Sequence, residues 1–273
     1  MRKVLFGVVV GFVSIACGGS SSEAPPPGDP YGSESGTTVV VGAGAGAGTV
    51  TKTPDGDQCI QLPSGECVRP QDKCKNGERA DVVIDSRGKV VEIVCYPASP
   101  QPAPVDADGN VELGKENKAV VSIGDVAGDV TAKGNNVTVY GQGPGVSTIG
   151  GKVAAEGNNF AMRGVTVKGN VELTGNNAAL VLCVVEGDVI IRGNNTVIAD
   201  CTVLGKIDID GNNSVLVANE VGKGITLSDA RNTVCDGNTS WSDANGNKVL
   251  DPGEGGAAIT CSPRFGSVGQ TKP

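Results

Sequence analysis

Oxygen-bearing side chains recur near the C-terminus at spacings that could hold a metal ion. Within a twelve-residue stretch they occupy positions 1, 3, 5, 9 and 12, and position 7 would contribute its backbone carbonyl. The residues at these positions are Asp243, Asn245, Asn247, Val249, Asp251 and Glu254. Carboxylate, amide and carbonyl oxygens are the ligands that calcium prefers. The stretch therefore predicts a structural calcium loop, and the alternative is an acidic, turn-rich surface loop.

This spacing resembles the calcium loop of the EF-hand family, in which the last carboxylate binds the ion through both oxygens. Leu250 matches the aliphatic residue that normally follows position 7. Pro252 fits a resemblance of this segment to bacterial calcium loops that lack full flanking helices. Lys248 departs from the pattern, because position 6 is normally a glycine that allows a sharp turn.

For catalysis the chain offers little. It contains no His, so Ser–His and Cys–His pairs and an imidazole base are excluded. A carboxylate pair could serve a polysaccharide lyase or glycosidase. The acidic candidates occupy outward positions on different repeats, where solvated surface charge is the ordinary explanation: Glu172, Asp188, Asp208 and Asp210. The chain is therefore expected not to be an enzyme.

The first residues have the form of a targeting segment. Two basic residues precede an apolar run at positions 4–15, which has the length of a signal peptide and is too short to span a bilayer. Residues 14–17, Ser-Ile-Ala-Cys, resemble the lipobox of bacterial lipoproteins, with Ser in place of the usual Leu. The resemblance implies that residues 1–16 are removed and that Cys17 is acylated. Because Gly18 follows, it also implies the outer membrane. The alternative is a plain secretory signal.

Two segments follow the signal. Residues 17–54 are rich in Gly, Ser and Pro, which predicts a flexible tether. Apart from Cys17, eight cysteines remain, and in an oxidising compartment an even number predicts disulfides. Residues 55–97 hold four of them, Cys59, Cys67, Cys74 and Cys95. About forty residues rarely fold unaided, so two disulfides are expected to stabilise this module.

Within the module, alternating apolar residues on both sides of residues 86–88 predict a β-hairpin. Zinc is the alternative for the four cysteines, but they contain no Cys-x-x-Cys pair. Residues 98–108 are a proline-rich linker.

From residue 109 onward a repeat dominates the sequence. One Asn position recurs at separations of 19, 23, 18, 18, 18 and 19 residues, at Asn117, Asn136, Asn159, Asn177, Asn195, Asn213 and Asn232. Two aliphatic positions keep the same period, with Val153, Val171, Val189, Ile207 and Ile225 in one, and Ala155, Leu173, Ile191, Ile209 and Leu227 in the other. Low-complexity sequence would not keep aliphatic residues in two fixed positions, so the repeat is structural.

Each repeat contains about three short alternations separated by glycines, which predicts three strands and a corner after each. A single coil of this kind cannot bury its apolar face, but stacked coils can. The prediction is an all-β parallel β-helix, or solenoid, over 109–240 with about 18 residues per coil. Asn tolerates the positive φ of a corner. We expect Asn195 and its equivalents to point inward as an amide ladder, with Asn194 pointing toward solvent.

The Gly-Asn-Asn units resemble a bacterial lipoprotein repeat family of unknown function, which supports the fold and implies no activity. A left-handed hexapeptide helix is not favoured, because its six-residue aliphatic period is absent; a right-handed or otherwise unclassified triangular coil is preferred. Five extra residues between Asn136 and Asn159 predict a bulging loop at one corner.

Four further cysteines lie in or after the repeat. Cys183 and Cys201 share a position in adjacent coils, so their Cα atoms should lie about 4.8 Å apart. That separation permits a disulfide, and a stacked pair of buried thiols is equally compatible. Cys235 and Cys261 are expected to pair and to close a cap at 241–261 over the open end of the solenoid. A tail at 262–273 completes the chain.

These features predict a lipid-anchored bacterial protein of the outer membrane or cell surface, or alternatively one that faces the periplasm. The leading role is structural or adhesive, and the partners are the membrane, through lipid on Cys17, and a glycan or an envelope protein. The alternatives are a carbohydrate-binding module, for which Trp241 and Tyr140 are the main aromatic candidates, and a lyase-like enzyme. The net charge of -8 gives no basic surface for nucleic acid.

Overall fold

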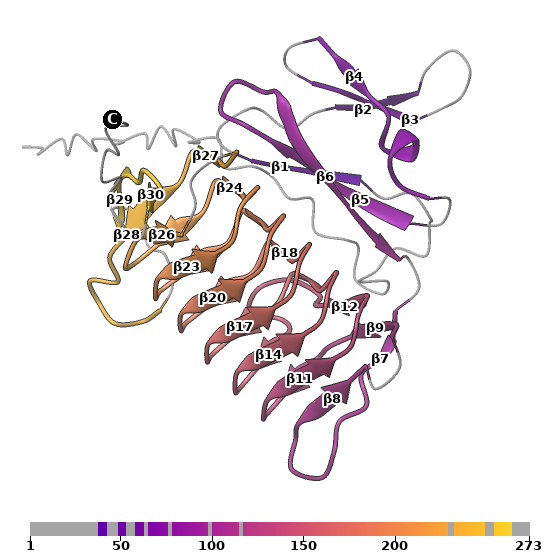
Figure 1. Cartoon of the computed structure of the whole chain (residues 1–273), viewed down its shortest axis with the longest axis vertical. Coiled ribbons are helices and arrows are strands. Elements are labelled where there is room, and N and C mark those ends of the chain that lie inside the picture. Colours follow the sequence, from indigo (N-terminus) through magenta and orange to yellow (C-terminus); the bar gives the residue numbers. More distant parts are fainter. Residues whose placement is uncertain are drawn as a thin grey trace, which may run out of the picture.

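The computed structural model describes residues 38–42, 49–52, 58–62, 65–75, 78–97, 100–114, 117–228, 232–248 and 254–263. They form a stack of β-coils with a small N-terminal module against one side (Figure 1). The predicted signal peptide and Cys17 lie outside the described residues. No helix within the described part of the chain is long and apolar enough to cross a membrane.

Three sheets of eight strands run along the solenoid, and successive coils add one strand to each sheet. The first solenoid sheet contains β8 (Val111–Leu113), β11 (Val130–Lys133), β14 (Val153–Glu156), β17 (Val171–Thr174), β20 (Val189–Arg192), β23 (Ile207–Asp210), β26 (Ile225–Leu227) and β30 (Ser262–Pro263). The second contains β7 (Gln101–Pro102), β9 (Ala119–Ser122), β12 (Val137–Tyr140), β15 (Ala161–Arg163), β18 (Ala179–Val181), β21 (Val197–Ala199), β24 (Val215–Val217) and β27 (Val234–Asp236). The third contains β10 (Asp125–Val126), β13 (Thr148–Ile149), β16 (Thr166–Val167), β19 (Val184–Val185), β22 (Thr202–Val203), β25 (Glu220–Val221), β28 (Thr239–Trp241) and β29 (Gly255–Ala258).

The strands pair in parallel, apart from the antiparallel pair β28 and β29. Val171 lies opposite Val189, so one turn of the solenoid takes 18 residues. The two aliphatic positions singled out in the sequence are buried in every coil and belong to one continuous core. These findings confirm the predicted parallel β-solenoid and its three strands per coil. The extra residues lie between β12 and β13, where the bulging loop was expected.

The N-terminal module is built from two small sheets. One contains β1 (Thr38–Gly42), β5 (Glu78–Ile84) and β6 (Val90–Pro97), and the other β2 (Thr49–Lys52), β3 (Gln58–Gln61) and β4 (Cys67–Val68), with a 3-10 turn η1 (Pro70–Asp72) after β4. The predicted hairpin is β5–β6. Disulfides join Cys59 to Cys67 and Cys74 to Cys95.

The boundaries predicted on either side of the cysteine-rich module are wrong. The sequence predicts a flexible tether over 17–54, but β1 pairs in parallel with β5 and β2 pairs with β3, so the module begins before its first cysteine. The linker assigned to 98–108 also contains β7, which pairs with β9 of the solenoid. Both segments are rich in Gly, Ser or Pro overall, but each contains a short stretch that pairs with a strand of a neighbouring element. In 17–54 the paired stretches are themselves rich in the strand-forming residues Thr and Val.

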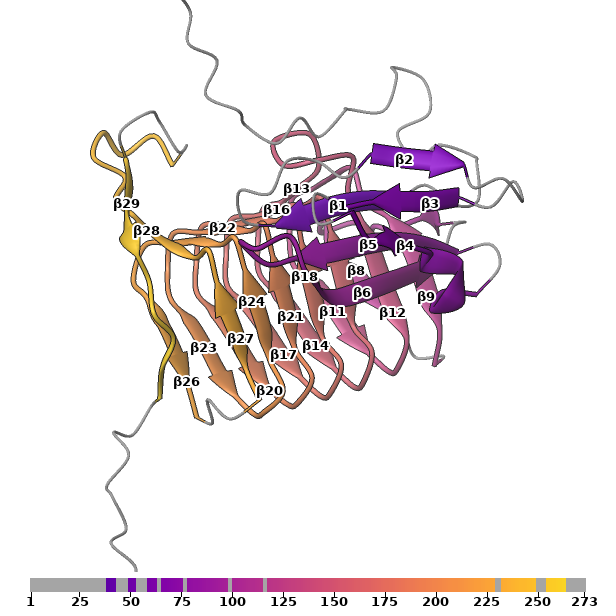
Figure 2. The same ribbon diagram turned by 90° about the horizontal axis from the view of Figure 1, so that it is seen from above.

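The module packs on the outward face of the second solenoid sheet, as the two orthogonal views show (Figures 1 and 2). A second apolar cluster joins them and contains Val83, Val94 and Tyr96 of the module with Tyr140, Ala179, Val181, Val197, Ala199, Val215 and Val217 of the solenoid. The middle of the second sheet is therefore buried on both faces. That explains why β18, β21 and β24 read as unbroken apolar runs rather than as alternations.

The C-terminal end of the solenoid is covered. Cys235 and Cys261 form a disulfide, β29 adds to the third sheet, and β30 extends the first sheet beyond β26. The strand β30 lies in the segment 262–273 that was predicted to be a tail, so that boundary is also wrong. The cap protects backbone edges that would otherwise be open to pairing with another chain.

Candidate functional site

The Gly-Asn-Asn units form the corner between the first and second solenoid sheets. The second Asn of each unit has a left-handed backbone conformation, with φ of 61° at Asn159, 60° at Asn177 and 59° at Asn195. Asn is one of the few residues other than Gly that tolerate this conformation. The glycine has a different role at this corner, because a Cβ on Gly193 would lie 1.8 Å from the carbonyl oxygen of Gly175 in the previous coil. Close stacking of the backbones therefore requires glycine.

The second Asn residues form an outer column of amides along this corner. Asn159 Nδ2 donates to Asn136 Oδ1 at 2.7 Å, and Asn177 Nδ2 donates to Asn159 Oδ1 at 2.7 Å. The column continues from Asn195 to Asn177 at 2.8 Å and from Asn213 to Asn195 at 3.1 Å. Each amide is thus held by its neighbour one coil away.

The first Asn residues form a parallel inner column. Asn176 Oδ1 accepts hydrogen bonds from the backbone N–H of Asn194 at 2.9 Å and from Asn194 Nδ2 at 3.0 Å. Asn158 Oδ1 accepts the same pair from Asn176. The inner column therefore ties backbone to side chain, whereas the outer column joins side chains alone.

The predicted orientation of the two Asn residues is wrong. Asn195, which is predicted to point inward, is exposed, and Asn194, which is predicted to face solvent, is half-buried. Asn117 also differs, because its Oδ1 accepts from Asn135 of the inner column at 3.3 Å. Asn232 has the expected positive φ of 54°. The period of the Asn residues gives the length of one coil correctly. It does not give the direction of their side chains, because a corner residue with positive φ directs its side chain away from the core.

The two columns line a shallow polar groove along four adjacent coils, with a volume of about 640 Å³. Its lining consists of Asn158, Asn159, Asn176, Asn177, Asn194, Asn195, Asn212 and Asn213. None of these side chains carries a charge. The groove is therefore a neutral surface whose hydrogen-bonding groups repeat once per coil.

A third polar column, which the sequence does not predict, lies inside the corner between the second and third solenoid sheets. Asn219 and Asn238 are fully buried, and Asn219 Nδ2 donates to Asn238 Oδ1 at 2.8 Å and to the carbonyl of Ile198 at 2.9 Å. In the sequence, Asn219 stands at the position that Cys201 occupies one coil earlier. A polar residue at a position that is otherwise apolar is the feature of the sequence that could have indicated this buried column. The buried amide ladder thus exists, at a different corner.

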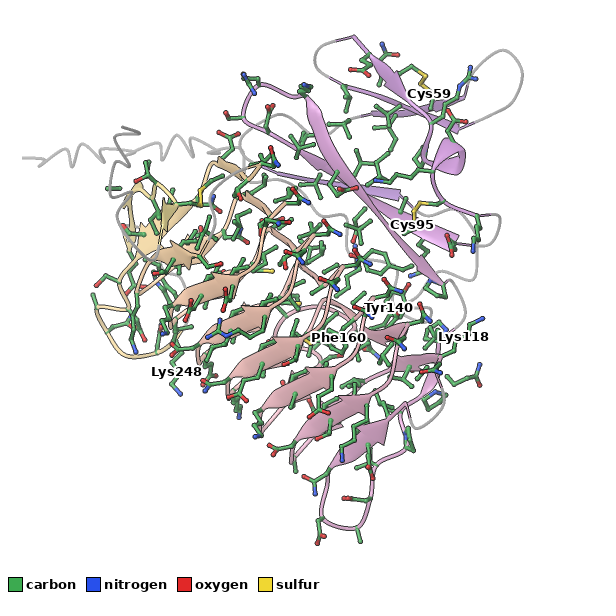
Figure 3. The ribbon with its side chains drawn as sticks, in the orientation of Figure 1. Cys59, Cys95, Lys118, Tyr140, Phe160 and Lys248 are labelled. Carbon is green, nitrogen blue, oxygen red and sulfur yellow. A yellow bond between two sulfur atoms is a disulfide. The ribbon has the colours of Figure 1, made fainter. Side chains whose placement is uncertain are left out.

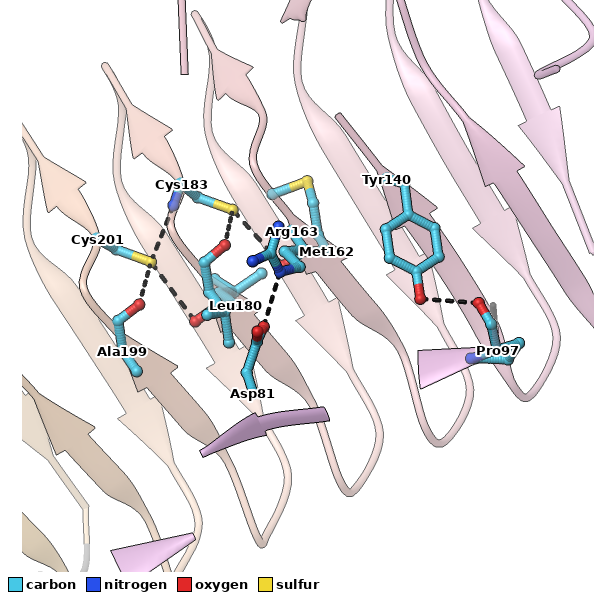
Figure 4. Close-up of polar contacts among 10 residues, drawn as sticks. Asp81, Pro97, Tyr140, Met162, Arg163, Leu180, Cys183, Ala199 and Cys201 are labelled. Atoms are coloured by element: carbon cyan, nitrogen blue, oxygen red, sulfur yellow. Dashed lines mark hydrogen bonds and ion pairs between the residues drawn. The ribbon is translucent and has the colours of Figure 1, made fainter. Parts of the chain in front are cut away.

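Cys183 and Cys201 belong to the same column and are free, buried thiols. Figure 4 shows that their sulfur atoms lie near backbone carbonyls, with Cys183 Sγ 3.3 Å from Val181 O and Cys201 Sγ 3.4 Å from Ala199 O. Burial raises the pKa of the Cys201 thiol. The two residues are therefore a stacked pair of buried thiols, which is the alternative to a disulfide, and both are shielded from solvent.

The predicted calcium loop is described in part, because Val249 and Asp251 lie outside the described residues. Lys248 has a φ of 61°, the left-handed conformation for which position 6 normally uses glycine. The backbone N–H of Lys248 donates to Asp243 Oδ2 at 3.0 Å, and that of Asn247 donates to Asn245 Oδ1 at 2.9 Å. The described part of the loop therefore turns sharply at position 6.

Two carboxylates of this loop are oriented by the surrounding protein. Glu254 Oε1 accepts from the backbone N–H of Ala244 at 2.9 Å, and its Oε2 accepts from Trp241 Nε1 at 3.3 Å. Asp243 Oδ1 is buried and has no hydrogen-bond partner among the described residues. An oxygen of this kind suits a bound cation, because an unpaired buried carboxylate oxygen is unfavourable.

The side chain of Lys248 is directed away from the loop. It lies on the outer loop beside the last coils (Figure 3), and its Nζ lies 2.6 Å from Glu186 Oε2 of the solenoid. The positive charge that departs from the EF-hand pattern is therefore paired with a solenoid carboxylate.

Of the acidic candidates, Asp208 and Asp188 have structural partners, and the two aromatic candidates are buried. Asp208 is buried and lies 3.5 Å from both Arg192 and Lys206, and Asp188 Oδ1 accepts from the backbone N–H of Lys206 at 3.0 Å. Glu172 is half-buried and Asp210 is exposed, both on the first solenoid sheet. Trp241 and Tyr140 are 3% and 2% exposed, so neither offers a ring to a sugar, and that expectation is wrong.

A possible metal cluster in the module, Cys74, Glu78 and Cys95, contains two cysteines that are joined in a disulfide. It therefore offers no thiolate ligand.

Comparison with protein-family models, with characterised proteins and with solved structures finds no significant match. The resemblance of the Gly-Asn-Asn units to a lipoprotein repeat family consequently rests on the sequence motif alone.

Proposed function

We propose that this protein is a lipid-anchored element of the bacterial envelope with a structural or adhesive role. The supporting observation is the solenoid of three sheets, in which two columns of Asn side chains join successive coils at the corner between the first and second sheets. A body stabilised between all its neighbouring coils is stiff. Such a body is suited to hold a repeating surface at a distance from an anchor.

The anchor in this proposal is lipid on Cys17, and the residues after it connect the anchor to the module. Three disulfides in the described chain support an oxidising, extracytoplasmic location. The role is proposed to be non-enzymatic. The buried carboxylate of Asp208 is paired with two cations, and Asp188 organises backbone, so these acids serve the fold.

Calcium is proposed as a structural ion of the cap. Asp243, Asn245, Asn247 and Glu254 would hold it together with Asp251 and the carbonyl of Val249. The orphaned Asp243 Oδ1 and the left-handed backbone at Lys248 support this donor set. The ion would neutralise the loop carboxylates and fix the segment enclosed by the disulfide between Cys235 and Cys261.

The proposed role is tested in cells that produce the parent chain or Cys17→Ser. The parent should be recovered in the membrane pellet with labelled fatty acid, and the cells should adhere to purified envelope material. Cys17→Ser should appear in the soluble fraction, and adhesion should be lost because the chain leaves the surface. Equal adhesion by both strains contradicts an anchored adhesive role, and membrane retention of Cys17→Ser without labelled lipid on the parent contradicts the anchor.

A further inference from the structure

The polar groove at the Gly-Asn-Asn corner retains hydrogen-bonding capacity that the fold does not use. A side-chain amide has two N–H donors and an oxygen with two lone pairs. In the outer column, Asn177 donates one N–H to Asn159 and accepts one hydrogen bond from Asn195. One N–H and one lone pair of Asn177 therefore remain for solvent or a ligand. The same pair is repeated at Asn195, one coil away.

These groups are fixed before any ligand arrives. Each outer amide is bonded to its neighbours at 2.7–3.1 Å, and the backbone below it is confined by the glycine stack. Binding to such an array loses little side-chain entropy, which otherwise opposes association. Adjacent parallel strands lie about 4.8 Å apart, and an extended sugar chain advances by a distance of the same order per residue.

The lining also limits the class of ligand. It is uncharged over four coils, so it complements neutral donors and acceptors rather than phosphates or uronates. Strand addition by a peptide requires an open sheet edge, but here the backbone N–H of Asn177 is already bonded to the carbonyl of Asn194. Hydroxyl groups, each of which both donates and accepts, match an amide that offers one donor and one acceptor.

We propose that this groove binds a neutral, linear polysaccharide lying along the solenoid axis, with successive sugar hydroxyls bonded to successive Asn amides. The proposal deepens the adhesive function above and rests on it, since it names the surface and the chemical class of partner. The described aromatic rings near the solenoid are buried, so recognition here depends on hydrogen bonds rather than on stacking. Each contact is weak, and affinity arises from several contacts along one chain.

The test uses the full mature chain and neutral oligosaccharides of glucose or N-acetylglucosamine, with two or six sugars. Nuclear magnetic resonance should show changes in the side-chain amide signals of the groove Asn residues when a hexamer is added. Because a hexamer spans several coils, it should bind at least about tenfold more tightly than a dimer. A hexamer of galacturonate serves as the charged control and should bind more weakly.

The matched variants keep the corner conformation. Asn177→Gly combined with Asn195→Gly removes two amides while glycine retains the positive φ without strain. Asn232→Gly makes the same change at an equivalent corner outside the groove lining. The groove variant should lose hexamer binding at least about tenfold, and the control should bind like the parent. If the groove variant does not fold, Asn177→Asp, which keeps the side-chain size and removes the donor, replaces it.

Several outcomes would overturn the proposal. The first is that neither neutral hexamer changes the resonance signals of the groove amides. The second is that the groove variant binds the hexamer as tightly as the parent does. The third is that the galacturonate hexamer binds as tightly as the neutral hexamers do. If hexamers fail to bind while the Cys17→Ser strain still loses adhesion, the groove assignment is wrong and the adhesive role stands. If hexamers bind and adhesion does not depend on Cys17, the groove stands and the anchored adhesive role is wrong.

Discussion

Arg163 Nε on the second solenoid sheet lies 2.8 Å from Asp81 Oδ2 of the N-terminal module. The Asp81 side chain is 3% exposed and the Arg163 side chain 22%. Beside this pair, the rings of Tyr96 and Tyr140 meet edge to face at 5.8 Å, and Tyr140 Oη donates to Pro97 O at 2.8 Å. Module and solenoid are therefore joined by an apolar cluster and by polar contacts that include this ion pair (Figure 4).

This pair gives the first prediction. Arg163→Met leaves the Asp81 carboxylate buried without its partner, so the free energy of unfolding should fall by about 3 kcal/mol. Adding Asp81→Leu should recover part of that loss, because an apolar pair of similar volume needs no desolvation of charge. Denaturant unfolding of the two single variants and the double variant measures the coupling. A double variant that is no more stable than Arg163→Met would contradict this account of the interface.

The second prediction concerns the glycine stack. A methyl group at residue 193 would lie 1.8 Å from Gly175 O, so Gly193→Ala must separate two coils and should lower stability by roughly 1–3 kcal/mol or more. Gly124→Ala is the control, because a Cβ there meets nothing within 4 Å. Thermal unfolding compares the two. Equal effects would show that close stacking of the corner is not what requires glycine at this position.

The calcium loop gives the third prediction. Calcium should raise the melting temperature of the cap by mass action, and Glu254→Gln should remove that increase because it removes a charged, bidentate ligand. Lys248→Gly should tighten binding, since φ at this residue is 61° and glycine adopts that conformation without strain. Titration calorimetry that detects no calcium heat for the parent or for Lys248→Gly would reduce the segment to an acidic turn.

The sequence predicted the coil well because its two determinants are local and periodic. A corner Asn with positive φ and a pair of inward aliphatic residues recur in every repeat, so their spacing revealed the turn length. The direction of Asn195 was wrong because the left-handed corner turns the side chain toward solvent, and a period of 18 residues does not distinguish the two sides of a corner.

The docking of the module could not be predicted in the same way. It depends on contacts between residues distant in sequence, such as Asp81 with Arg163 and Pro97 with Tyr140. One signal was present and was not used. Residues 215–217 and 197–199 are apolar without alternation, and such runs indicate a sheet that is buried on both faces.

The fourth prediction concerns pH. Burial, together with the nearby Glu220 carboxylate, raises the pKa of Asp200 above its usual value of 3.8. The folded protein therefore holds this proton more tightly than the unfolded chain does, and stability contributed by the protonated form is lost as pH rises through the folded pKa. Asp200→Asn keeps the residue's φ of 54° and removes the charge.

At pH 7, Asp200→Asn should increase the free energy of unfolding by roughly 0.5–1 kcal/mol. Below the usual Asp pKa the difference should disappear, because the parent carboxyl is then protonated in both states. Unfolding measured from pH 3 to pH 8 checks this. If the stability gained by Asp200→Asn is independent of pH, the charge of Asp200 is not the origin of that gain.

The most direct test of the central claim, that an anchored solenoid attaches through its Asn corner, is the retention of cells under flow on a surface coated with a neutral linear polysaccharide. Cells with the parent chain or with Asn232→Gly should be retained. Cells with Cys17→Ser should detach because the chain is released, and cells with Asn177→Gly and Asn195→Gly should detach although the chain remains on the membrane. Equal retention of all four strains would contradict the account.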